Sequence, residues 1–143
     1  MEVVVNAGPG IDLDKKALKK ACLKVLKAEA TRKDAVLSLS AVNANEMRDL
    51  NRKYLEEDCA TDVLAFPMQE ESKQGFLLGD VVICPEFIQN EKGQYDVETG
   101  KELEFVAAHG VLHLLGYDDR DAEEWRRMES REREILGLRG VNE

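Results

Sequence analysis

The chain has 143 residues, of which 43% are hydrophobic and 34% are charged. This length suits one domain with its own hydrophobic core, and the composition is that of an ordinary soluble protein. The formal net charge of −9 argues against indiscriminate binding to nucleic acid.

The first third of the chain predicts two strands with a helix between them. Residues 3–5 are three valines followed by a Gly-Pro-Gly turn, which is typical of a short strand. Residues 12–29 repeat apolar side chains at helical spacing and carry lysines on the other face. Residues 36–42 alternate apolar side chains with serines, which indicates a second strand.

The next segment predicts a helix and a strand. Asn43 and Glu46 form a plausible capping box for a helix that continues to Glu57. Residues 61–68 indicate a third strand, and Pro67 near its end would suit a strand at the edge of a sheet.

A polar loop or hairpin turn is predicted for residues 69–75, followed by a fourth strand over residues 76–84. Gly79 inside this strand indicates a bulge or a close approach of another backbone. Residues 85–100 are mixed in character and leave room for a short helix.

Two helices are predicted for the rest of the chain. Residues 103–115 are apolar on nearly every side, which is typical of a buried helix. Asp121 and Glu124 have the form of a capping box for a charged last helix that ends at Gly137. We therefore predict a single α+β domain over residues 1–143, with a four-stranded mixed sheet and a buried central helix.

The buried helix carries both histidines of the protein. His109 and His113 are four residues apart, so they lie on one helical face. Buried imidazoles need polar partners, and a divalent metal would satisfy both at once. Gly116 can end the helix and turn the chain back, which would bring Asp119 to the same metal. Two alternatives stay open: Asp118 as the third ligand, or a metal-free pair of core histidines.

The spacing of these ligands is that of the elongated zinc-peptidase motif. That motif needs a glutamate directly after its first histidine as the general base, and Gly110 occupies this position. Because glycine has no side chain to accept a proton, the sequence argues against peptidase activity.

Four segments together carry a resemblance to a known family. They are the Asn-x-x-Tyr segment and the stretches that begin TDVLAFP, LGDVVI and HGVLHLLGYD, at residues 50–54, 61–67, 78–83 and 109–118. In this order they resemble the YbeY family of metal-dependent endoribonucleases.

The resemblance implies a metal, usually zinc, bound once per chain by His109, His113 and Asp119, where the family normally has a third histidine. It also implies cleavage of single-stranded RNA, maturation of the 3′ end of small-subunit ribosomal RNA, and ribosome quality control. The expected partners are therefore single-stranded RNA, ribosomal RNA and the ribosome, with no DNA.

A family arginine thought to serve RNA cleavage is replaced by Leu55 in this chain. Arg48, Arg52 and Leu55 share one helical face, so Arg52 is a candidate to contact phosphate instead. Residues 12–34 carry a local charge of +4 and offer a basic face for RNA. In both cases the alternative is a set of charges that simply face water.

We predict a metal-dependent endoribonuclease, with Zn²⁺ or another divalent transition metal as the cofactor. A metallopeptidase-like hydrolase and a ribosome-associated metal-binding protein without turnover are the alternatives. No apolar run is long enough to span a membrane and the first residues lack a signal sequence, so we expect a cytoplasmic protein. Three widely spaced cysteines indicate free thiols rather than disulfides.

Overall fold

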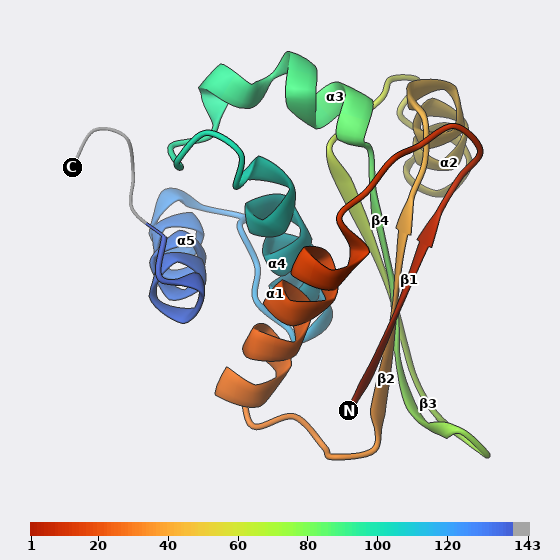
Figure 1. Cartoon of the computed structure of the whole chain (residues 1–143), viewed down its shortest axis with the longest axis vertical. Helices are drawn as coiled ribbons and strands as arrows, with labels where there is room; N and C mark the ends of the chain where they lie inside the picture. The colour runs from red at the N-terminus through yellow and green to blue at the C-terminus, as the bar shows by residue number, and fades with distance from the viewer. Residues whose placement is uncertain (139–143) are drawn as a thin grey trace.

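The computed structural model describes residues 1–138, in which four strands form one sheet and helices pack on both of its faces (Figure 1). The predicted domain extends to residue 143, and residues 139–143 lie outside the described part. The elements, in chain order, are β1 (Glu2–Ala7), α1 (Lys15–Ala28), β2 (Ala35–Ala41), α2 (Ala44–Leu55), β3 (Val63–Ser72), β4 (Gly75–Ile83), α3 (Pro85–Asn90), the 3₁₀ turn η1 (Lys92–Gln94), α4 (Glu102–Leu114) and α5 (Ala122–Leu136).

The sheet is mixed, as predicted. Its strand order is β1-β2-β4-β3, with β1, β2 and β4 parallel and β3 antiparallel to β4. β3 lies at the edge, where Pro67 removes a backbone donor without disturbing a central ladder. None of the described helices is both long and apolar enough to cross a membrane.

The hairpin turn predicted within residues 69–75 is present, but it is shorter than the predicted polar stretch. β3 continues to Ser72 and β4 begins at Gly75, so most of this stretch is paired strand. The Ser72 hydroxyl donates to the carbonyl oxygen of Gly75 at 2.7 Å and closes the turn. Polar side chains are tolerated here because this end of β3 is exposed, and the ladder needs only backbone groups.

The bulge predicted at Gly79 is confirmed. Leu37 pairs with Gly79 where regular pairing would meet Leu78, so the β2–β4 register shifts by one residue. Gly79 has φ of +146°, and a Cβ atom there would lie 2.3 Å from the carbonyl oxygen of Phe66. Glycine is therefore required at this position.

Side-chain caps fix the start of three helices. Asp14, Asn43 and Asp121 each accept a hydrogen bond from the backbone N–H three residues later. α1 thus begins at Lys15 rather than at residue 12, because Asp14 is its cap. The other two caps are those that the sequence predicted.

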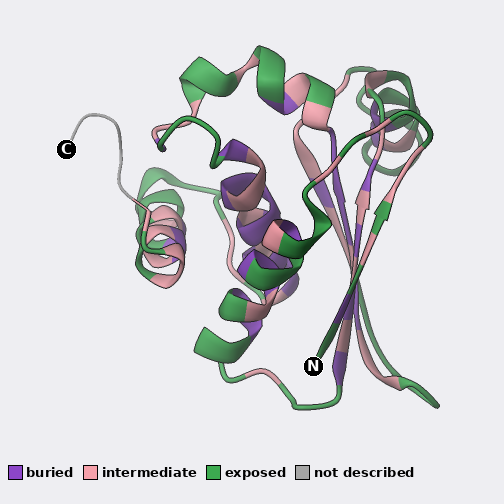
Figure 2. Ribbon diagram, viewed as in Figure 1, coloured by how far each residue is buried: buried purple, intermediate pink, exposed green. Residues whose placement is uncertain are grey.

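α4 is the central helix of the fold. It packs against β3 and β4, with α1 beside it against β1 and with α5 on the outer side of both helices (Figure 1). Most of its residues are buried, whereas α1 and α5 each expose one face (Figure 2). α2 covers the opposite face of the sheet, where Met47 packs against Leu64 and Val82 in a second, smaller core. The predicted buried helix is confirmed.

Candidate metal centre

The turn after α4 returns the chain toward the two histidines. Gly116 has φ of +103°, and its N–H donates to the carbonyl oxygen of His113 at 3.1 Å. The N–H of Tyr117 donates to the carbonyl oxygen of Leu112 at 3.0 Å. This pair of bonds is the Schellman arrangement, which needs a left-handed residue after the helix. Glycine at 116 therefore places the following aspartates beside the helix end.

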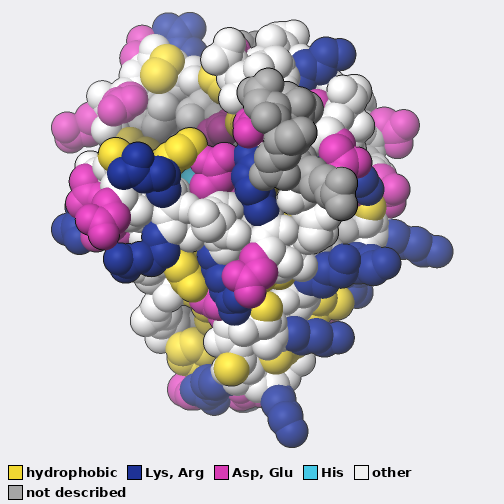
Figure 3. Space-filling model, turned by 90° about the vertical axis from the view of Figure 1, so that its left-hand side faces the viewer, with side chains coloured by type: hydrophobic (Ala, Val, Ile, Leu, Met, Phe, Trp, Pro, Cys, Tyr) yellow, Lys and Arg dark blue, Asp and Glu magenta, His cyan; other side chains and the backbone are white. Residues whose placement is uncertain are grey.

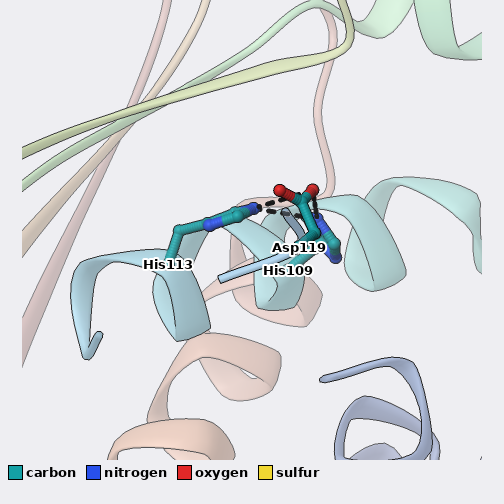
Figure 4. Close-up of side chains that lie close together, drawn as sticks. All are labelled: His109, His113 and Asp119. Carbon is teal, nitrogen blue, oxygen red and sulfur yellow. Dashed lines mark hydrogen bonds and ion pairs between the residues drawn. The ribbon is translucent and has the colours of Figure 1, made fainter. Parts of the chain in front are cut away.

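His109, His113 and Asp119 point toward one another (Figure 4). The Nε2 atoms of the two histidines are 3.1 Å apart. One carboxylate oxygen of Asp119, Oδ2, lies 3.5 Å from Nε2 of His113 and 3.7 Å from Nε2 of His109. Metal–ligand bonds of about 2.0–2.2 Å at tetrahedral angles put neighbouring ligand atoms roughly 3.3 Å apart. The three atoms therefore have the spacing that a tetrahedral metal site requires.

The hydrogen bonds of the imidazoles also suit a cation. Nδ1 of His113 is 3.2 Å from the carbonyl oxygen of Tyr117, which can only accept, so Nδ1 carries the proton. Nε2 of His113 then presents a lone pair. Nδ1 of His109 contacts the carboxylate of Glu132, which leaves its Nε2 facing the same point. A cation is what such converging acceptor atoms can bind together.

The two histidines differ in their pKa values. Burial lowers the pKa of His109, but the carboxylates of Glu132 and Asp119 outweigh burial and raise it above its ordinary value. Burial and the neighbouring His109 hold the pKa of His113 below its ordinary value. The lowered pKa of His113 favours its neutral form, which is the form that binds metals.

Asp118 has other partners. One of its carboxylate oxygens accepts from the N–H of Asp119 at 2.7 Å, and the other pairs with Arg120 at 2.7 Å. Asp121 caps α5. The structure thus directs Asp119, rather than Asp118 or Asp121, toward the histidines.

The triad opens into a cleft of about 890 Å³. A histidine is visible in a hollow on this face, beside hydrophobic side chains and charged side chains of both signs (Figure 3). The walls come from the end of α2, from β3, from the segment around η1, and from α5. Three side chains that line the cleft are large, apolar and unusually exposed: Tyr54 (54%), Leu55 (56%) and Trp125 (47%).

Acidic side chains also line the cleft. Besides Asp119, they are Asp62, Asp96 and Glu129, and the hydroxyl of Tyr95 donates to Asp62 at 2.9 Å. None of the described residues that line the cleft is a lysine or an arginine. The predicted basic face of residues 12–34 therefore contributes no wall of this cleft.

Arg52 lies outside the lining of the cleft. Its guanidinium pairs with Asp49 at 2.9 Å and lies 3.7 Å from Asp58, which also pairs with Arg48. Leu55, at the position of the family arginine, does line the cleft. The two arginines thus form an exposed ion-pair network beside the cleft, and Arg52 stays a candidate for phosphate only at its rim.

Gly110 faces the sheet and not the cleft. A Cβ atom at this position would lie 2.6 Å from Val81 and 2.9 Å from Val63. A glutamate here would meet the sheet before it could reach the triad, which supports the argument against peptidase chemistry.

We expect Gly110→Ala to lower the melting temperature by several degrees. Valine side chains have little freedom to move aside, and overpacking costs about 1–3 kcal/mol, more than the roughly 1 kcal/mol that alanine gains over glycine in a helix. Thermal unfolding followed by circular dichroism measures the change. Gly93→Ala, where no atom lies within 4 Å, is the control and should be neutral or stabilising. A Gly110→Ala protein as stable as the parent would contradict this packing.

Some residues at the site were not predicted from the sequence. Glu132 on α5 and the cleft residues Asp62, Tyr95 and Trp125 all lie outside the histidine motif. A signal for Glu132 does exist, because it follows Met128 by four residues and so interrupts the buried stripe of an otherwise charged helix.

The fold and the cleft define a small α+β protein with a candidate metal centre of two histidines and one carboxylate. A family model described as "Endoribonuclease YbeY" matches residues 6–139. The chain belongs to the YbeY family.

Curated relatives named Endoribonuclease YbeY match over most of their lengths. The relative from Pelotomaculum thermopropionicum is 41% identical over 125 residues, which are 84% of this chain and 82% of the relative. That from Oceanobacillus iheyensis is 39% identical over 122 residues, 79% of each chain. That from Mycolicibacterium gilvum is 32% identical and covers 95% of this chain and 82% of its own.

A solved structure shares the fold. The solution structure of TM1509 from Thermotoga maritima superposes with a TM-score of 0.60 at 25% identity, covering 94% of this chain and 89% of that one. The α+β architecture predicted from the sequence is thus also that of a related solved structure.

Proposed function

We propose that this protein is a metal-dependent endoribonuclease that cleaves single-stranded RNA. The observation that carries the proposal is the convergence of His109, His113 and Asp119 at the floor of a cleft, in a chain of the YbeY family. Its expected setting is the cytoplasm, where it would act on ribosomal RNA in the maturation and quality control of the ribosome.

The three side chains would hold one divalent metal, with zinc the best fit to the spacing and to the two nitrogen ligands. Such a metal would lower the pKa of water in the cleft and polarise a phosphoryl oxygen of the substrate. His109 and His113 supply nitrogen ligands from a rigid buried helix, and Asp119 supplies a negative charge that helps to retain a divalent cation.

The walls of the cleft favour unpaired nucleotides. Tyr54 and Trp125 are aromatic and exposed, and aromatic side chains bind single strands by stacking on bases. Asp62 is acidic, and Asp96 and Glu129 pair with Arg133, so the cleft offers bases rather than phosphates a favourable surface. Phosphate contacts would then come from the rim, where Arg52 is the candidate.

The test is cleavage of a single-stranded RNA oligonucleotide before and after removal of metal. We expect the purified protein to carry about one zinc per chain, to cleave the single strand faster than a duplex of the same sequence, and to stop after treatment with a chelator. Added zinc should restore cleavage. Metal content is measured by elemental analysis and cleavage by gel electrophoresis.

Two results would contradict the proposal. Cleavage that continues at the parent rate in metal-free protein would rule out a catalytic metal. Stoichiometric zinc without any RNA product would favour the alternative of a ribosome-associated metal-binding protein.

A further inference from the structure

Glu132 is a fully buried carboxylate. It lies on α5 with 0% of its surface exposed, on the helical face that also carries the buried Met128. Placing a carboxylate in such a position is costly unless it is hydrogen-bonded or paired with a cation. A buried glutamate on an otherwise ordinary packing face therefore needs a specific partner.

Its partner is His109. Within residues 1–138, Nδ1 of His109 is the one group that hydrogen-bonds to the Glu132 side chain. The second oxygen, Oε2, is buried and has no hydrogen-bond partner among the residues that the structure describes. The contact joins residues 23 apart in sequence and spans the interface between α4 and α5.

The contact determines which nitrogen of His109 faces the cleft. The carboxylate of Glu132 accepts, so Nδ1 carries the proton, and the neutral imidazole then has its lone pair on Nε2. That Nε2 atom is 3.1 Å from Nε2 of His113 and 3.7 Å from Asp119. A carboxylate behind a metal-binding histidine holds the ring in place and makes its nitrogen a stronger ligand.

We propose that Glu132 is a positioning residue of the metal centre, which fixes the orientation and the protonated nitrogen of His109 and thereby tightens metal binding. His113 has a weaker counterpart, because its Nδ1 faces the neutral carbonyl of Tyr117 at 3.2 Å. Of the two histidines, His109 therefore has the charged partner at Nδ1 and His113 has the neutral one. This inference rests on the metal centre in the proposed function.

The test compares zinc affinity in the parent and in Glu132→Gln, measured by competition with a chromophoric chelator. Glutamine keeps the shape but removes the charge, and we expect affinity to fall about 10–100-fold, the loss typical of second-shell partners. Glu134→Gln is the matched control, since Glu134 lies on the same helix but pairs with Arg131 at the surface. It should bind zinc like the parent.

A second readout separates positioning from a structural role. Co²⁺ substituted for zinc absorbs visible light according to its ligand geometry, so Glu132→Gln should change that spectrum in the folded protein. A structural role would lower thermal stability and leave both the spectrum and the zinc affinity of the folded fraction unchanged. If Glu132→Gln does not fold, Glu132→Asp replaces it; the shorter side chain keeps the charge but draws it back from Nδ1, so affinity should again fall.

The outcomes distinguish this inference from the proposed function. A parent that binds no zinc overturns the proposed metal centre. A parent that binds zinc tightly, with Glu132→Gln within twofold of it and an unchanged Co²⁺ spectrum, overturns the role of Glu132 alone.

Discussion

Asp119→Ala should lose both its zinc and its RNA cleavage. Oδ2 of Asp119 is within 3.7 Å of both imidazole Nε2 atoms, and its removal leaves two ligands where a stable site needs at least three protein ligands. The loss of affinity should exceed the roughly 10–100-fold that a missing second-shell partner costs. Zinc content after dialysis and the rate of RNA cleavage measure the effect.

Asp118→Ala is the matched control. Its carboxylate is adjacent in sequence but bonds to the N–H of Asp119 and to Arg120, so the variant should keep most of its zinc and activity. Asp119→His restores a nitrogen ligand of the kind that the family normally has there, and it should retain the metal. The assignment of Asp119 is wrong if Asp119→Ala binds zinc as tightly as the parent.

Trp125→Ala and Tyr54→Ala should each weaken the binding of single-stranded RNA. Loss of an aromatic stacking partner costs about 1–3 kcal/mol per base, which corresponds to roughly fivefold to more than a hundredfold in affinity. Trp125 is the only tryptophan of the protein, so its fluorescence reports directly on a base that stacks against it. Titration with a short single-stranded oligonucleotide gives the dissociation constant of the parent, and the rise in KM measures the loss in both variants.

Two comparisons make this result specific. Trp125→Phe keeps an aromatic ring and should lose less than Trp125→Ala. Arg52→Ala should have a smaller effect, because its guanidinium is held by Asp49 and lies outside the cleft lining. Parent-like affinity in both alanine variants of the aromatic residues would show that the cleft does not bind bases.

The sequence predicts this fold well where the signals are local. The caps at Asn43 and Asp121, the bulge at Gly79 and the turn at Gly116 each depend on a few neighbouring residues. The same holds for the pair of histidines and for Asp119, because a helix end and a left-handed glycine determine their separation.

Contacts between distant segments could not be predicted in this way. The pairing of Glu132 with His109 depends on how α5 crosses α4, and helical spacing alone does not give that arrangement. Arg52 shows the same limit. The sequence places it correctly on the face that carries Arg48, but Asp58 in the following turn binds both arginines at the surface. Only the folded structure shows which charged side chains are already paired with another charge.

In the proposed metal centre, the contact between Glu132 and His109 would link two equilibria that are usually measured separately. One is the docking of α5 on α4, and the other is metal binding by His109, His113 and Asp119. Each process would favour the other by the same factor. Amide hydrogens of α5 should therefore exchange more slowly when metal is bound, although the helix contributes no ligand. A change on the outer surface of α5 that loosens its docking would, by the same reciprocity, release metal from a centre whose ligands are all intact.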